Sequence, residues 1–290
     1  MPSTLIEPSE LAAHLADPEW AIIDCRFDLA RPAWGAHAWS QGHIPHALYA
    51  NLDRELSGPR SPATGRHPLP QPAALAATFG RFGIDGSVQV VSYDQDSGAF
   101  AARLWWLLRW LGHRKVAVLN GGFAAWERAG LPVSSTAETR VARRFAPAAD
   151  ASMLVSGSEV AAALDAGTFT DGAQVLVDAR SAARFAGENE TIDPVAGHVP
   201  GARNHPFSAN HDAQGRLLQA AELRRAWQKT LRGAPVQSVI TMCGSGVTAC
   251  HNLLALEVAG LSGARLYAGS WSEWIRDPAH AVARGPETAG

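Results

Sequence analysis

A cysteine follows an apolar, β-branched run in the segment VITMCGSGVTACHNLL, residues 239–254. Two glycines come next, and apolar residues at helical spacing follow them. The glycines permit a tight turn with inward-pointing backbone N–H groups, and the start of a helix adds partial positive charge. Such a cradle favours the thiolate, which is the nucleophilic form of cysteine. The predicted cradle consists of Cys243, Gly244, Ser245, Gly246, Val247 and Thr248.

Two chemistries use a cysteine in an anion cradle. Cysteine phosphatases need an arginine at the end of a C-x5-R loop, where it clamps the phosphate. Here Ala249 occupies that position, and the loop carries no cationic side chain. The shorter loop better fits a persulfide on Cys243, with its negative charge held by backbone N–H groups. Cys25, inside a strand, and Cys250, in the following helix, are expected to be buried structural thiols.

The chain contains an internal repeat. The segment AIIDCR (21–26) corresponds to VLVDAR (175–180), and GHIPHA (42–47) corresponds to GHVPGA (197–202). We therefore expect a first domain over residues 1–136, a linker over 137–152 and a second domain over 153–290. Asp94 stands in the first copy where Cys243 stands in the second. The second domain is therefore predicted to be catalytic and the first non-catalytic.

Each copy alternates short apolar strands with helical patterns, which predicts an α/β fold with a mainly parallel sheet and helices on both faces. In the first copy we expect strands near 21–24, 88–93 and 116–118. The expected helices lie near 9–16, 72–81, 98–111 and 121–129, and the segment over 98–112 is apolar nearly all round. The Asp-Arg pairs Asp24/Arg26 and Asp178/Arg180 occur in both copies and are interpreted as strand-end fasteners. His43 and His198 are interpreted as turn residues.

Composition excludes several classes of function. The chain has 290 residues, of which 47% are hydrophobic and 18% charged, and its net charge is −2. A near-neutral chain gives no reason to expect binding to nucleic acid or to an anionic membrane surface. Three cysteines without a CxxC pair do not predict a zinc site, and we expect no metal or cofactor. The opening residues lack the pattern of a secretory signal, which favours a cytoplasmic protein.

At this point the sequence resembles a known family. The loop CGSGVTA and the segments GSWSEW (269–274) and RFAGENETIDPVAGHVPGA (184–202) are similar to those of tandem-rhodanese sulfurtransferases, in particular the 3-mercaptopyruvate sulfurtransferases. The resemblance covers both copies and the linker. It implies that Cys243 takes a sulfur atom from a small-molecule donor and passes it to a small thiol, to thioredoxin or to cyanide.

The resemblance also implies roles for residues outside the loop. A serine–histidine–aspartate relay is proposed in the family, and Ser245, His67 and Asp53 match its members. Arg184 matches an arginine that binds the donor's carboxylate, whereas the family's second arginine falls on Asp193. We expect Arg66, reaching across from the first domain, to supply that missing charge.

Two alternatives to a mercaptopyruvate enzyme stay open. Thiosulfate-preferring rhodaneses carry cationic loop residues where this chain has Gly244 and Ser245, but the departure at Asp193 favours thiosulfate. A non-catalytic persulfide carrier would give one equivalent of product and then stop, whereas an enzyme would continue while donor and acceptor last.

Overall fold

The computed structural model describes residues 4–286; the outermost residues of the two expected domains, 1–3 and 287–290, lie outside this range. The contacts within the chain divide it into two compact units. Unit 1 comprises residues up to 58 together with 69–150 and 211–217, and unit 2 comprises 59–68, 151–210 and 218 onward. The segment 59–68, which carries Arg66 and His67, therefore belongs by its contacts to unit 2.

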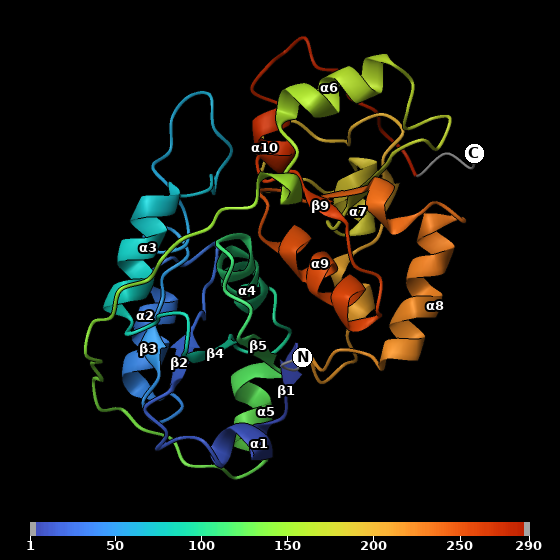
Figure 1. The fold of residues 1–290 in the computed structure, drawn as a ribbon. Helices are drawn as coiled ribbons and strands as arrows, with labels where there is room; N and C mark the ends of the chain where they lie inside the picture. Colours follow the sequence, from blue (N-terminus) through green and yellow to red (C-terminus); the bar gives the residue numbers. More distant parts are fainter. Residues whose placement is uncertain (1–3, 287–290) are drawn as a thin grey trace. The chain divides into compact units, whose positions relative to one another are not determined.

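Unit 1 contains a five-stranded parallel sheet in the order β1-β5-β4-β2-β3 (Figure 1). Its strands are β1 (Leu5–Ile6), β2 (Trp20–Asp24), β3 (Leu48–Tyr49), β4 (Gln89–Tyr93) and β5 (Val116–Leu119). Its helices are α1 (Pro8–Ala12), α2 (Trp34–Gln41), α3 (Pro72–Arg81), α4 (Ala101–Trp110) and α5 (Gly122–Arg128). The expected strands and helices are all present, although the first helix ends four residues early, and α2, β1 and β3 were not predicted.

Helices cover both faces of this sheet. Successive residues of a strand point to opposite faces. In β4, Tyr93 packs in a core cluster with Phe123 of α5, whereas the hydroxyl of Ser92 donates to the carbonyl of Ala101 in α4 at 3.1 Å. The helices α4 and α5 therefore lie on opposite faces, and every residue of α4 except Arg109 is buried, as its apolar sequence predicted.

Unit 2 repeats the plan with a four-stranded parallel sheet in the order β7-β6-β8-β9. Its strands are β6 (Val175–Asp178), β7 (Arg203–Asn204), β8 (Val239–Met242) and β9 (Arg265–Leu266). Its α-helices are α6 (Gly157–Asp165), α7 (Ala182–Ala186), α8 (Ala220–Leu231), α9 (Thr248–Val258) and α10 (Ser270–Trp274), and the 3₁₀ turns are η1 (Ala151–Met153), η2 (Phe207–Asn210) and η3 (Val236–Ser238). The predicted fold class, two α/β domains with parallel sheets, is confirmed.

The core of unit 2 places its central strand deep in the protein. All four residues of β8 are buried, and Ile240 and Met242 pack against Trp271 and Trp274 of α10. On α9, all eight residues from Ala249 to Leu256 are buried. The strand β8 and the helix α9 thus form a rigid support on each side of the loop that joins them. Among residues 4–286, no helix has the length and apolar character needed to cross a membrane.

Candidate active site

The cysteine loop lies between the carboxyl end of β8 and the first turn of α9, where parallel α/β sheets carry their reactive groups. The side chain of Cys243 is buried, and its Sγ accepts the backbone N–H of Gly246 at 3.2 Å. Val247 and Thr248 open α9, where the first N–H groups of a helix have no partner within the helix. The local geometry therefore gives the sulfur one backbone donor, the N–H of Gly246, and places it next to the positive end of a helix.

The two glycines of the loop serve different purposes. Gly246 has a φ of +76°, which favours glycine, and a Cβ there would collide with the carbonyl oxygen of Ala268. The φ of Gly244 is not positive. Its missing side chain instead leaves space, because a Cβ there would lie 3.2 Å from Nη2 of Arg66 and 3.6 Å from Nη2 of Arg184. The sequence predicted a special backbone at both positions, but the structure requires it only at Gly246.

Residues at the start of α10 hold the cysteine loop through hydrogen bonds. The Oγ of Ser270 accepts the backbone N–H of Cys243 at 3.0 Å and donates to the carbonyl of Tyr267 at 2.9 Å. The backbone N–H groups of Trp271 and Ser272 donate to the carbonyls of Cys243 and Gly244, each at 2.9 Å. Hydrogen bonds to Ser270, Trp271 and Ser272 therefore hold the first two residues of the loop in one conformation. The segment GSWSEW was noticed as a family signature, but these contacts were not predicted from it.

Unit 2 brings Ser245 and His67 together. Nδ1 of His67 lies 2.7 Å from Oγ of Ser245, and the two residues are only 1% and 5% exposed. A hydrogen bond of this length between buried groups is a competent path for a proton. Asp53, the third predicted member of the relay, belongs to unit 1, where its backbone N–H donates to Oδ1 of Asn51 at 2.9 Å.

The guanidinium groups of two arginines lie against Gly244. Arg66 directs Nη2 there, and Arg184, on α7, directs both of its terminal nitrogens there. Among the described residues, Nε and Nη2 of Arg66 and Nη1 of Arg184 have no hydrogen-bond partner. Nε and Nη2 form one edge of the guanidinium, the edge that binds a carboxylate through two parallel hydrogen bonds. Unpaired guanidinium donors therefore lie beside the cysteine loop, and one of them, Nε of Arg66, is buried.

Two buried carboxylates hold these arginines in place. Oδ1 of Asp193 accepts Nη1 of Arg66 at 2.5 Å, and Oδ2 accepts Nη2 of Arg184 at 3.0 Å. Glu190 binds Nε of Arg184 at 3.0 Å and lies 3.4 Å from Arg180. Burial opposes the charge of Glu190, but the Arg184 guanidinium and the backbone N–H of Asp193 outweigh it and lower the pKa of Glu190. Sequence analysis did not predict these roles, and the carboxylates of the segment ENETIDP were the available signal.

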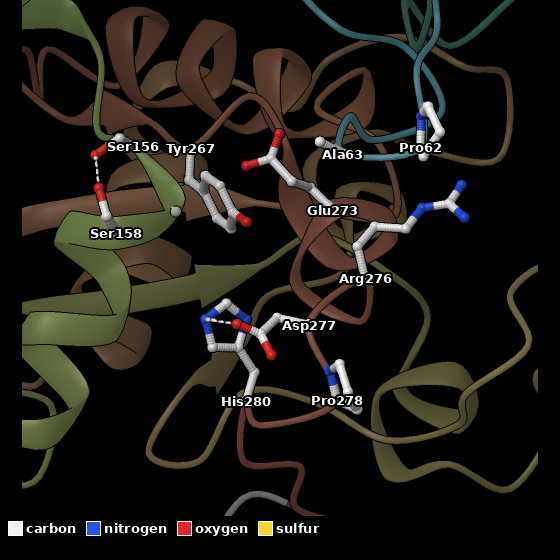
Figure 2. Close-up of a pocket in the computed structure, with 11 residues that line it drawn as sticks. Pro62, Ala63, Ser156, Ser158, Tyr267, Glu273, Arg276, Asp277, Pro278 and His280 are labelled. Atoms are coloured by element: carbon white, nitrogen blue, oxygen red, sulfur yellow. Dashed lines mark hydrogen bonds and ion pairs between the residues drawn. The ribbon is translucent and has the colours of Figure 1, made fainter.

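A separate pocket of about 640 Å³ is lined by Glu273 of α10 and by residues that follow this helix, among them Arg276 and His280 (Figure 2). Of the described residues that line it, none belongs to the cysteine loop. Glu273 lines this pocket beside Tyr267, and burial raises the pKa of Glu273 while the backbone N–H of Gly65 opposes that rise. A Cβ on Gly65 would approach the carbonyl oxygen of Gly269 to 2.5 Å, so the segment 59–68 packs closely on the start of α10. Glu273 thus helps to fasten the segment that carries Arg66 and His67.

Comparison with known proteins agrees with this arrangement. The model of the rhodanese-like domain matches the chain twice, over residues 7–129 and 157–277. The chain is 48% identical over 283 residues to a probable 3-mercaptopyruvate sulfurtransferase of Pseudomonas aeruginosa, covering 97% of this chain and 98% of the relative. It is 38% identical over 284 residues to a putative thiosulfate sulfurtransferase of Mycobacterium tuberculosis, covering 97% of each.

A solved structure is also similar over nearly the whole chain. The 3-mercaptopyruvate sulfurtransferase from Leishmania major superposes with a TM-score of 0.83 at 33% identity, covering 96% of this chain and 77% of that protein. Two matches to one domain model, together with relatives aligned from end to end, account for the repeat seen in the sequence. The chain belongs to the rhodanese family, with two rhodanese-like domains, and is an enzyme of the sulfurtransferase class.

Proposed function

We propose that the protein transfers sulfur from 3-mercaptopyruvate to a thiol or cyanide acceptor through a persulfide on Cys243. The observation that carries this proposal is the set of unpartnered guanidinium nitrogens of Arg66 and Arg184 beside Gly244, one residue from the cysteine. A keto acid donor has a carboxylate that this edge fits, and binding there brings its thiol group to the cysteine loop.

The reaction proceeds in two steps that balance. The Cys243 thiolate attacks the sulfur of mercaptopyruvate, the carbon–sulfur bond breaks, and its electron pair stays on carbon as the enolate of pyruvate. The enolate takes the proton that the donor's sulfur loses, so pyruvate leaves and Cys243 carries the second sulfur as a persulfide. An acceptor thiolate or cyanide then attacks the outer sulfur and regenerates the cysteine thiolate. The cradle formed by Gly244, Gly246 and the start of α9 stabilises the sulfur anion in each state.

The contact between Ser245 and His67 supports a role in moving that proton. The serine hydroxyl gives its proton to the enolate carbon and takes one from Nδ1 of His67, and the proton that the donor's sulfur loses restores the histidine. Asp53 is retained in this proposal as the group that orients the histidine, on the resemblance alone. Ser245→Ala should lower kcat about tenfold with little change in KM, because it removes a proton path rather than a binding contact.

The proposal assigns catalysis to the second domain, residues 153–290, with Arg66 and His67 supplied by the segment 59–68. The first domain, residues 1–136, is non-catalytic because Asp94 stands at the nucleophile position, and residues 137–152 link the two. Small thiols and thioredoxin are the proposed acceptors besides cyanide. A reducing cytoplasm suits an enzyme whose three cysteines are free thiols.

Thiosulfate is the second candidate donor, and the Mycobacterium tuberculosis relative's description favours it. The absence of a cationic side chain from residues 244–246 speaks against it, since a doubly charged donor gains more from cations at the loop.

The test compares the two donors on one preparation of the full chain. Mercaptopyruvate should add about 32 Da, one sulfur atom, to Cys243, and the gain should be absent from Cys243→Ser. Pyruvate should then form over many turnovers with a thiol present. A single equivalent of pyruvate would identify a carrier instead, and a higher kcat/KM for thiosulfate would replace the proposed donor.

A further inference from the structure

The carboxylate of Asp193 lies between the two arginines that face the cysteine loop. One of its oxygens binds Arg66 and the other binds Arg184, and its side chain is 1% exposed. The arginines themselves are each 19% exposed. The negative charge is therefore buried, whereas the two guanidinium groups are partly exposed and lie within 4 Å of the Cβ position of Gly244.

The charges of this cluster balance. Arg66 and Arg184 contribute two positive charges, and Asp193 and Glu190 contribute two negative charges, each in direct contact with an arginine. The Asp178–Arg180 pair next to Glu190 adds no net charge. A donor that enters therefore meets well-placed hydrogen-bond donors without a large net positive field.

We propose that Asp193 is a specificity-determining residue that favours donors with a single carboxylate charge over dianionic donors. This inference rests on the proposed function and concerns the same site. A monoanion satisfies the unpaired Nε–Nη2 edge of Arg66 through hydrogen bonds, for which geometry matters more than net charge. A dianion carries a second charge that the cluster cannot compensate, because Asp193 and Glu190 have already neutralised both arginines, so Asp193 repels it more strongly.

Mercaptopyruvate and thiosulfate differ in charge only until the sulfur atom has been transferred. Thiosulfate passes its outer sulfur to the Cys243 thiolate by breaking the sulfur–sulfur bond, and sulfite leaves with that electron pair. Both donors thus produce the same persulfide. Discrimination by Asp193 has to act on donor binding and on the approach to the transition state, and it should appear in kcat/KM.

The first experiment measures kcat/KM for both donors in wild type, Asp193→Asn and Asp193→Glu. Asp193→Asn should raise the ratio of thiosulfate to mercaptopyruvate about tenfold, because one nearby negative charge is removed. Asp193→Glu keeps the charge but alters the geometry, so its ratio should stay within about twofold of wild type even if both activities fall. Asp171→Asn, on the exposed surface of unit 2, is the matched control for removing a carboxylate elsewhere. An unchanged ratio in Asp193→Asn, or an equal rise in Asp193→Glu, would overturn the inference.

A binding measurement separates this inference from the proposed function. Pyruvate and sulfate, a monoanion and a dianion that donate no sulfur, can each protect Cys243 from alkylation by iodoacetamide. In wild type, pyruvate should protect Cys243 at a lower concentration than sulfate. Asp193→Asn should lower the ratio of the protecting sulfate concentration to the protecting pyruvate concentration about tenfold. If wild type shows no turnover of mercaptopyruvate, the proposed function fails. If it turns over but the difference between pyruvate and sulfate is the same in both proteins, only the role of Asp193 fails.

Discussion

The two units differ in the residue that begins the corresponding loop of each sheet. In unit 1, the loop after β4 begins with Asp94, whose buried carboxylate accepts backbone N–H groups of its own loop. The donors are Asp96, Gly98, Phe100 and Ala101, at 3.3, 2.9, 2.7 and 3.1 Å. In unit 2, the loop after β8 begins with Cys243. The Asp94 carboxylate fills the first cradle, whereas in the second the sulfur of Cys243 accepts the backbone N–H of Gly246.

The backbone around the two loops is nearly the same. The N–H of Phe123 donates to the carbonyl of Asp94 at 2.8 Å, and the N–H of Trp271 donates to the carbonyl of Cys243 at 2.9 Å. Just before these donors, Gly122 and Ser270 have φ values of +56° and +54°. Unit 2 thus places a serine in a backbone conformation that glycine tolerates better, and its hydroxyl holds the N–H of Cys243. Unit 2 therefore accepts local strain at Ser270 while this residue holds the backbone N–H of Cys243.

The strongest test of this comparison gives unit 2 the residue of unit 1. Cys243→Asp should abolish sulfur transfer, with turnover reduced by at least about a thousandfold, because a carboxylate cannot form a persulfide. The variant should still fold, since Asp94 shows that this backbone accepts an aspartate. Thermal unfolding followed by circular dichroism checks the fold, and pyruvate release checks activity. Substantial residual turnover would show that another residue carries the sulfur.

The next test concerns the two arginines beside the cysteine loop of unit 2. Arg66→Ala should lower kcat/KM for mercaptopyruvate about a hundredfold, because it removes the unpaired guanidinium edge that we propose as the binding site of the donor's carboxylate. Arg276→Ala, which removes an exposed arginine from α10's neighbourhood, is the control and should have little effect. Equal activity of the two variants would mean that Arg66 does not bind the donor.

Removing the carboxylate of Asp94 tests whether this group stabilises the fold of unit 1. Asp94→Ala should reduce the free energy of unfolding by about 2–3 kcal/mol, since buried N–H groups lose their acceptor. Urea unfolding measures the effect, with Asp96→Ala, at a less buried position of the same loop, as comparison. Burial raises the pKa of Asp94, while the N–H groups of Phe100, Ala101 and Gly98 oppose that rise. A folded-state pKa above the unfolded value means that the stabilisation is fullest in acid and declines as pH rises through that range, so the variant's deficit should shrink toward neutral pH.

The smallest expected effect comes from exchanging the strained residue. Ser270→Gly copies unit 1, relieves the backbone and removes the acceptor for the N–H of Cys243. Stability should change by less than about 1 kcal/mol, because the two effects offset each other, while kcat falls about threefold to tenfold. An unaltered rate of alkylation at Cys243, together with unaltered kcat, would show that the serine does not position the nucleophile.

Much of this protein could be predicted from residue types and spacing. The continuous apolar runs of β4 and β8 predicted buried parallel strands, and the repeat predicted two α/β domains, because such patterns depend on local chemistry. Short elements such as β1 and β3, with two residues each, gave too little pattern to be predicted. The contrast between Asp94 and Cys243 was readable because the repeat aligned the two loops.

The arginine cluster shows the limit of this reasoning. Arg66 was expected to reach the site from the first domain, yet its segment packs with unit 2, where Arg66 shares Asp193 with Arg184. Asp193 could be recognised as unusual from the sequence, but its position between two arginines separated from it by 127 and 9 residues could not. Long-range ion pairs depend on how whole segments pack, and no local pattern records that packing.

The sequence alone determined the repeated α/β architecture and the glycine that the cysteine loop requires, because strand burial and backbone freedom belong to single residues and short runs. The assignment of Cys243 as the nucleophile stays a prediction. Only the tertiary structure decided which charges surround that loop and which remain open to a ligand. Those depend on distances of a few ångströms between segments far apart in the chain, where a guanidinium becomes available or neutralised according to the carboxylate that packs behind it.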